Sequence, residues 1–137
     1  MGSSVVMSYE QTTGDISVRV TPRFMEADSD PVQQRYLWAY TVEIANGGCY
    51  AVRVLSRRWQ IVDAMGQVHE VSGDGVIGKQ PLIEPGGTFS YTSGTPLQTP
   101  SGIMHGTYEV RDDNGSVYEI VIPVFSLDSP HDRARVN

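Results

Sequence analysis

The stretch YLWAYTVEIAN, Tyr36 to Asn46, decides the fold class, because its large apolar residues occupy every second position. A β-strand sends alternate side chains to opposite faces, whereas one face of a helix recurs every three to four residues. The stretch therefore predicts a strand with one buried face. It ends at Asn46-Gly47-Gly48, a sequence that is typical of a turn.

The same period of two recurs on both sides of this stretch. The apolar residues that mark further strands are Ile16, Val18 and Val20; Val52, Val54, Trp59, Ile61 and Val62; Val68 and Val71; Phe89 and Tyr91; Tyr108 and Val110; and Tyr118, Ile120, Ile122 and Val124. No window shows a helical repeat, since 14 glycines and 8 prolines interrupt the chain. The sequence thus predicts an all-β protein.

Local signals refine these strands. Met65-Gly66 predicts a hairpin, and Asn114-Gly115 predicts a type I′ turn, whose central residues need positive φ angles. Pro123 cannot donate to a ladder, so we expect its strand at a sheet edge or at a bulge. Tyr108, at an expected strand start, resembles the tyrosine corner of immunoglobulin-like folds, where the hydroxyl bonds to upstream backbone.

The regular spacing of short strands permits a sandwich or a small barrel, and Tyr108 favours the sandwich. At 137 residues the chain suits one domain. We expect a single immunoglobulin- or fibronectin type III-like β-sandwich of seven to eight antiparallel strands over residues 15–127. Residues 1–14 and 128–137 have the composition of flexible termini.

Charge and cysteine content limit the partners and the compartment. Ten basic and sixteen acidic side chains give a net charge of −6 at pH 7, which disfavours nucleic acid and anionic membranes as partners. Cys49 is the only cysteine, so no intrachain disulfide can form and a reducing compartment is expected. The sequence shows neither a secretory leader nor an apolar run of about 20 residues. We therefore expect a cytoplasmic protein.

Gly73, Gly75 and Gly78 spell GxGxxG, the pattern that brings backbone against a pyrophosphate in dinucleotide-binding folds. Those folds continue the pattern into a helix, but here Pro81 follows almost at once, so that fold is excluded. Two interpretations stay open. The N–H groups of the loop can form an anion-binding nest beside Lys79, the only lysine, or the glycines can serve unusual backbone angles in a packed loop.

Residues for metal or catalytic chemistry are sparse. The three histidines, which show no metal-ligand spacing, are His69, His105 and His131. No serine or cysteine lies in a nucleophile motif. We therefore expect no metal site, no cofactor and no enzymatic activity. Glu26, Asp28 and Asp30 form either a solvated acidic loop or a weak site for a hard cation.

One basic-aromatic cluster lies within RVLSRRW, Arg53 to Trp59. Its first two arginines, Arg53 and Arg57, are expected to form cross-strand ion pairs or part of an interaction surface. The candidate acidic partners of such pairs are Glu43 and Asp63. The tryptophan that ends the cluster is expected in the core.

Four segments together resemble the ApaG family, and the similarity extends over about Asp15 to Leu127. The segments are Leu55–Trp59 (LSRRW), Gly73–Pro81 (GDGVIGKQP), Pro85–Gly94 (PGGTFSYTSG) and Leu97–Tyr108 (LQTPSGIMHGTY). The sequence departs from the family at Arg58, where a histidine commonly precedes the tryptophan, and at Ile77, where valine is usual.

The resemblance implies a fibronectin type III-like sandwich, in agreement with the periodicity. It also implies an association with cobalt and magnesium tolerance in bacteria, and similarity to protein-recognition domains of eukaryotic F-box and polymerase-interacting proteins. We therefore expect a non-enzymatic binding module for an unidentified protein partner, with only an indirect link to metal tolerance. The contact is expected at the connection from Ser72 to Gly87.

The alternative is a nucleotide or pyrophosphate sensor, because the glycine pattern of the family has been suggested to contact pyrophosphate. In this chain Gly73, Gly75 and Gly78 would supply backbone donors. Lys79 or Arg58 would supply the positive charge.

Overall fold

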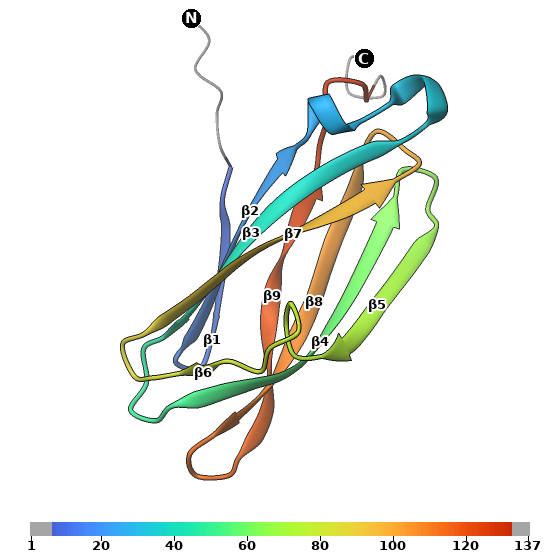
Figure 1. Ribbon diagram of the computed structural model, residues 1–137. Helices are drawn as coiled ribbons and strands as arrows, with labels where there is room; N and C mark the ends of the chain where they lie inside the picture. The colour runs from blue at the N-terminus through green and yellow to red at the C-terminus, as the bar shows by residue number, and fades with distance from the viewer. Residues whose placement is uncertain (1–6, 133–137) are drawn as a thin grey trace, which may run out of the picture.

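The structure is a computed structural model that describes residues 7–132. Within this range the chain forms nine β-strands and two short 3₁₀ turns (Figure 1). The strands are β1 (Tyr9–Thr13), β2 (Ile16–Phe24), β3 (Tyr36–Asn46), β4 (Val52–Asp63), β5 (Val68–Asp74), β6 (Leu82–Ile83), β7 (Thr88–Leu97), β8 (Gly102–Asp112) and β9 (Val117–Leu127). The turns η1 (Glu26–Asp28) and η2 (Pro31–Gln33) connect β2 to β3. No helix in this range has the length and apolar character needed to cross a membrane.

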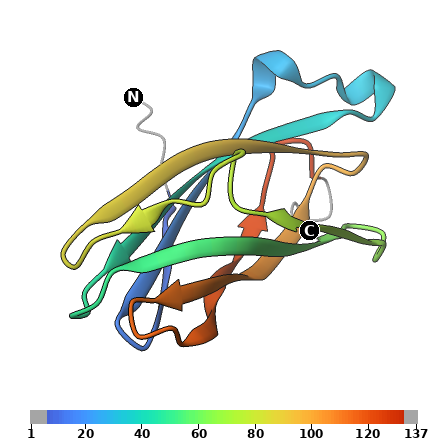
Figure 2. The same ribbon diagram turned by 60° about the horizontal axis from the view of Figure 1, so that its bottom comes forward.

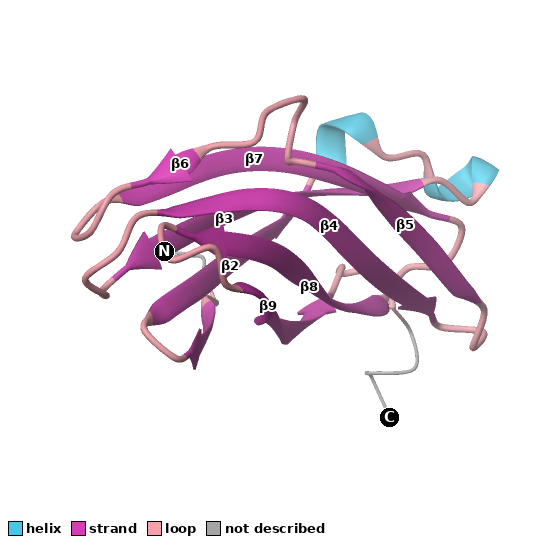
Figure 3. Cartoon of the chain, turned by 90° about the horizontal axis from the view of Figure 1, so that it is seen from below, coloured by secondary structure: helices cyan, strands magenta, loops and turns pink. Residues whose placement is uncertain are grey.

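The strands form two antiparallel sheets that face each other as a sandwich (Figures 1 and 3). Within residues 7–132, one sheet has the order β1-β2-β3-β7 and the other β5-β4-β8-β9, with β6 paired to β4. β1 packs against β9 on one side, whereas β5 and β7 are the outer strands on the other side. The predicted all-β sandwich is confirmed, and it is consistent with an immunoglobulin- or fibronectin type III-like fold.

Two short strands raise the number above the expected seven to eight. β1 lies inside residues 1–14, for which the sequence predicts a flexible terminus. Its sequence YEQTT shows no apolar alternation, but its ladder with β2 runs from the Tyr9–Val20 pair to the Thr13–Ile16 pair. β6 has only two residues. The parts of the expected flexible termini at residues 1–6 and 133–137 lie outside the described residues.

The core lies between the inner faces of the two sheets. The inner face of β3 carries the alternate residues of the deciding stretch, all buried: Tyr36, Trp38, Tyr40, Val42 and Ile44. Burying such a side chain stabilises the fold by about 1.5–3 kcal/mol. The indole N–H of Trp38 donates to the carbonyl oxygen of Asp128 at 2.8 Å, which ties the chain after β9 to this core.

A bulge in β4 changes which alternate residues face the core. The ladder with β8 shifts register between Val54 and Ser56, so Leu55 is the extra residue. Val54 faces inward before the bulge, and Arg57 and Trp59 face inward after it. The tryptophan is 2% exposed, which confirms its predicted place in the core.

Pro123 lies where β8 and β9 lose register. The ladder is regular up to the Gly106–Ile122 pair and resumes at the Met104–Phe125 pair. β9 is also the outer strand of its sheet. The expectation of an edge or a bulge is therefore confirmed on both counts, since neither place needs the N–H that proline lacks.

The predicted hairpin at Met65-Gly66 is confirmed and joins β4 to β5. Gly66 has a φ of 83°, which requires the freedom of glycine. The carboxylate of Asp63 accepts hydrogen bonds from the N–H groups of Met65 (2.9 Å) and Gln67 (3.0 Å).

The turn between β8 and β9 is present, but its predicted type I′ geometry is wrong. Gly115 has a φ of 83°, whereas Asn114 is not among the residues with positive φ. The carboxylate of Asp112 accepts from the N–H groups of Asn114 (2.9 Å) and Ser116 (3.0 Å). These two bonds to the Asp112 side chain stabilise a different turn geometry, which the Asn-Gly pair alone does not indicate.

The tyrosine-corner role predicted for Tyr108 is also wrong. Tyr108 lies inside β8, and its hydroxyl bonds to the hydroxyl of Tyr91 in β7 of the facing sheet. Because the side chain of Tyr108 points into the sandwich, its nearest polar partner comes from the opposite layer and not from upstream backbone.

Candidate functional site

The glycine-rich segment follows the outer strand β5 and leads to β6; we call residues 73–80 the glycine loop. Its tip is closed by two backbone bonds, from the Val76 N–H to the Lys79 carbonyl (2.7 Å) and from the Lys79 N–H to the Val76 carbonyl (2.9 Å). Ile77 and Gly78 between them have φ angles of 43° and 75°, as in a type I′ turn. The loop is thus a tight reversal of the chain.

The conformation of the loop accounts for each of its glycines. A Cβ on Gly75 would overlap the carbonyl oxygen of Lys79, and its φ is 63°. Gly78 has open space around it but also a positive φ. Gly73 lies against the guanidinium of Arg57, so that a Cβ there would approach two of its nitrogens to 3.2 Å.

Arg57 attaches the glycine loop to β4. Its side chain starts from the inner face of the sheet because the bulge at Leu55 turns it inward. Nη1 donates to the carbonyl oxygens of Asp74 (3.0 Å) and Gly75 (2.9 Å). Val76, the next residue, is fully buried in the core. The loop is therefore held by Arg57 and by the burial of Val76 before the chain returns to β4 at β6 (Figure 2).

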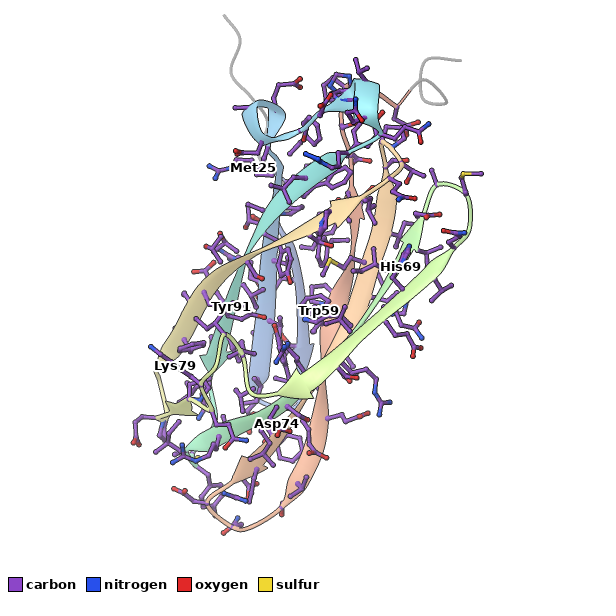
Figure 4. All side chains as sticks on the ribbon, turned by 45° about the vertical axis from the view of Figure 1, so that its right-hand side comes forward. Met25, Trp59, His69, Asp74, Lys79 and Tyr91 are labelled. Carbon is purple, nitrogen blue, oxygen red and sulfur yellow. The ribbon has the colours of Figure 1, made fainter. Side chains whose placement is uncertain are left out.

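Three tyrosines of the interior surround this anchor. Burial raises the pKa of Tyr40, Tyr91 and Tyr108 above the usual value of 10.0, and the positive charge of Arg57 opposes part of that rise. All three phenols are therefore neutral at physiological pH. Figure 4 shows Tyr91 and Trp59 in the middle of the molecule, with Asp74 and Lys79 on either side of the loop.

Arg58 lies on the outer face of the same sheet, beside a polar hollow of about 250 Å³. The carboxylates of Asp74, Glu109 and Glu119 border the same hollow. Glu109 and Glu119 are direct partners in the β8–β9 ladder, so their side chains share a face. A phosphate bound at Arg58 would meet these negative charges.

The five residues that the sequence predicts for phosphate binding do not all line the same hollow. Arg58 and Gly73 border the hollow, whereas Gly75, Gly78 and Lys79 are not among its lining residues. The Gly75 N–H donates to the carbonyl of Leu55 in β4 at 2.7 Å. Together with the closed bonds of the tip, this leaves fewer loop N–H groups to face an anion.

The acidic loop before β3 does not gather its carboxylates. Glu26 lies 3.2 Å from the ring of His131, and Asp30 accepts from the Gln33 N–H at 3.4 Å. Within the part of the chain that the structure describes, no group of three or more His, Cys, Asp or Glu side chains is placed to hold a metal ion. The cation-site interpretation of this loop therefore lacks its ligand cluster.

The predicted ion pairs of the basic cluster are wrong. Arg53 donates to the carbonyl oxygen of Gln80 at 2.8 Å, and Arg57 donates to loop carbonyls. Glu43 belongs to the other sheet, and Asp63 contacts a histidine 3.5 Å away. The arginines bind backbone because the glycine loop passes over them, which the local sequence does not show.

β5 has a free edge, because within residues 7–132 it pairs only with β4 and ends the order of its sheet. All of its residues except Gly73 are exposed. Val68 and Val71 are 56% and 44% exposed, which is high for valines in a strand. Backbone groups that point away from β4 are thus open to a further strand.

Comparison with known proteins places the chain in a family. The model of the ApaG domain matches residues 26–112. Protein ApaG of Paramagnetospirillum magneticum is 54% identical over 129 residues, which cover 94% of this chain and 99% of the relative. The chain belongs to the ApaG family. Protein ApaG of Methylobacterium nodulans is also 54% identical, over 125 residues that cover 91% of this chain and 96% of the relative.

The likeness to the ApaG family extends to a solved structure. A crystal structure described as an ApaA protein of Bordetella pertussis superimposes with a TM-score of 0.83 at 50% identity. The match covers 85% of this chain and 95% of that one. The predicted family is thus confirmed, and the sandwich of this ApaG-family chain agrees with that of a close relative.

The sequence motifs of this ApaG-family chain do not single out the carboxylates on the outer face. Glu109 and Glu119 lie at equal distances from the turn at Asn114, so counting outward from the turn places them opposite each other. Predicting this pair from the sequence therefore needs only the register of the β8–β9 hairpin. Asp74 joins them through Ser56, which pairs with both Asp74 and Glu109.

A larger hollow, of about 490 Å³, lies at the end of β2 in this ApaG-family chain. Phe24, Trp38 and Tyr9 contribute aromatic surface to it, and Arg23 contributes a charge. None of the site residues predicted from the sequence borders this hollow. It therefore has no part in the phosphate-binding hypothesis.

Proposed function

We propose that this ApaG-family chain is a non-enzymatic binding module of the cytoplasm that recruits a protein partner. The contact lies at the free edge of β5 and at the glycine loop that follows. The observation that carries the proposal is the unpaired edge of β5, seven residues long and exposed. Such an edge presents N–H and C=O groups to which a partner can add a strand.

Exposed apolar side chains beside this edge provide anchors. Val68 and Val71 lie on β5, and Ile77 at the tip of the glycine loop is 52% exposed. Its φ of 43° is unusual for a β-branched residue. Strained, exposed positions of this kind are concentrated at functional sites, which supports a role for the loop in recognition.

β7, the outer strand of the facing sheet on the same side of the sandwich, is less suited to the same task. Its exposed positions carry hydroxyls, as at Thr88, Ser90 and Thr92. Pro96 near its end cannot donate a backbone hydrogen bond. The edge of β5 therefore combines backbone pairing with apolar anchors in a way that β7 does not.

The cobalt and magnesium tolerance implied by the family resemblance is then an indirect effect. In this proposal the partner, and not a metal site of this chain, connects the protein to metal tolerance. Loss of partner binding and loss of tolerance should therefore occur in the same variants.

The test is affinity capture of the full chain from a bacterial lysate, read by mass spectrometry. Lysine on an edge strand blocks strand addition, so Val71→Lys should reduce retention of the partner at least about tenfold. The control is Val117→Lys, because Val117 is also a valine of an outer strand in the same sheet and is 53% exposed. Equal retention by the two variants would contradict the proposal.

Phosphate binding by the glycine loop is the second candidate function. The N–H groups of Ile77 and Gly78 donate no hydrogen bond within residues 7–132, and the side chain of Lys79 beside them is exposed. Two free amides next to an ammonium group are the elements of a small anion nest.

Titration with ATP or diadenosine tetraphosphate, with and without magnesium, tests this candidate. Binding should shift the amide resonances of residues 73–79, and Lys79→Ala should weaken the response. An equally weakened response in Arg58→Ala would show that Arg58, beside the hollow, takes part in the same phosphate binding. Unmoved amides at millimolar nucleotide would eliminate phosphate binding here.

A further inference from the structure

The two faces of β5 differ, and the ladder with β4 assigns each side chain to one of them. Val71 is paired with Trp59, whose side chain is buried, so Val71 lies on the inner face. Residues at alternate positions therefore point outward. The outward residues of β5 are Val68, Glu70, Ser72 and Asp74.

The outward row of β5 is acidic. Glu70 accepts one hydrogen bond, from the side-chain amide of Gln60 at 2.7 Å. Neither Glu70 nor Asp74 forms an ion pair with any residue that the structure describes. β5 itself contains no Lys or Arg. A strand added at this edge would thus place its own side chains beside one valine and two carboxylates that form no ion pair, with Arg58 of β4 on the same face opposite Ser72.

We propose that the partner adds an antiparallel strand with a defined pattern, an inference that rests on the proposed function. Lys or Arg faces Asp74 and Glu70, and an aliphatic residue faces Val68. On the inner face an apolar residue packs beside Val71. In the direction of the partner chain, two basic residues four positions apart are followed by an aliphatic residue two positions later.

A second copy of this chain does not fit the same pattern. Self-pairing of β5 about Val71 would place Glu70 opposite Ser72 and Val68 opposite Asp74. Neither carboxylate would gain a cation, and each Val68 would face the charge of an Asp74. Opposite charges that face each other across a ladder stabilise it, so a basic partner strand is favoured over a homodimer.

The test uses two blocked synthetic peptides, KTTVKTV and its charge-reversed form ETTVETV, with the ¹⁵N-labelled full chain. KTTVKTV should shift the amides of residues 68–74 and bind about tenfold more tightly than ETTVETV. In Glu70→Lys the preference should disappear, because each peptide then forms one attractive and one repulsive pair. In the double variant Glu70→Lys/Asp74→Lys the order of the two peptides should reverse. The matched control is Glu84→Lys, which should leave the order unchanged, because Glu84 is exposed and does not line the hollow beside Asp74.

Equal binding of both peptides by the natural chain, an unaltered preference in Glu70→Lys, or shifts confined to residues outside β5 would overturn the inference. A concentration-dependent dimer that Val71→Lys dissociates would overturn it as well, because the occupant of the edge would then be a second copy. The proposed function fails separately: it falls if Val71→Lys retains the captured partner, whatever the peptides do.

Discussion

Gly75 and Gly78 both have left-handed backbone, but their surroundings differ. A side chain at Gly75 would overlap the Lys79 carbonyl, whereas a Cβ at Gly78 would have no other atom within 4 Å. Gly78→Ala should therefore cost about 1–2 kcal/mol of unfolding free energy, from backbone strain alone. Gly75→Ala should cost clearly more, because the clash adds to the strain. Urea unfolding of the two variants measures both, and equal losses would contradict this geometry.

The hydroxyls of Tyr91 and Tyr108, which are bonded to each other, predict that the stability of the fold depends on pH in the alkaline range. Burial raises the pKa of both phenols above 10.0, so the folded state favours the neutral form. Their contribution to stability is therefore complete below pH 10 and is lost as the pH rises through the raised values.

Replacing both tyrosines by phenylalanine removes this ionisation and leaves no hydroxyl without a partner. The midpoint of alkaline unfolding, followed by circular dichroism, should then move to higher pH. Tyr50→Phe is the control, since Tyr50 is 50% exposed. An unchanged midpoint in the double variant would show that the buried pair does not govern alkaline unfolding.

At the scale of elements, the β4–β5 hairpin depends on Asp63. Burial would raise the pKa of its carboxyl, but bonds from the N–H groups of Gln67 and Met65 and the contact with His69 lower it below the usual 3.8. Because the folded-state pKa is depressed, the stabilisation is present above pH 3.8 and is lost as the pH falls through the lower value.

Asp63→Asn should therefore be less stable than the natural chain at pH 7, with a difference that shrinks toward pH 3. Urea unfolding at three pH values between these limits follows the difference. A constant difference would mean that the charge of Asp63 does not support the hairpin. His69→Gln should give the same trend with a smaller effect, since only one contact is lost.

The position of the bulge in β4 is a feature that the sequence alone does not determine. Val52 and Val54 occupy even positions, but Trp59 and Ile61 occupy odd ones, so an extra residue is needed for one face to hold all four. The periodicity indicates that a bulge exists. Only the ladder with β8 places it at Leu55, because neighbouring positions satisfy the pattern equally well.

At the scale of the whole molecule, β1 closes the sandwich on the side of β9. The hydroxyl of Thr13 accepts from the Val121 N–H at 3.0 Å, and the ring of Tyr9 lies 6.1 Å from that of Phe125. A chain that begins at Asp15 should still fold, as the domain boundary predicted from the sequence requires, but with reduced stability.

We expect its melting temperature to fall by roughly 5–10 °C, which corresponds to a loss of about 2 kcal/mol. Differential scanning calorimetry gives the value. A chain that begins at Met7 serves as the reference, because it keeps all of β1. A shortened chain with an unchanged melting temperature would mean that β1 contributes nothing to the fold.

The sequence alone determined the class of the fold, the longer strands, most of the core and the family. These follow from relations between residues two positions apart or from continuous motifs, which are present in the linear chain. It also located the glycines of the loop. Glycine permits a positive φ because it has no Cβ, and the folded loop uses this freedom at Gly75 and Gly78 but not at Gly73.

Only the tertiary structure decided which edges are free and what the arginines bind. The order of strands in a sheet depends on pairing between distant segments, so the exposed edge of β5 cannot be read from its own seven residues. A single extra residue at Leu55 directs Arg57 to the loop carbonyls and away from acidic side chains. Local periodicity assigns each side chain to one face of a sheet. Which groups that face contacts depends on segments that are distant in the sequence.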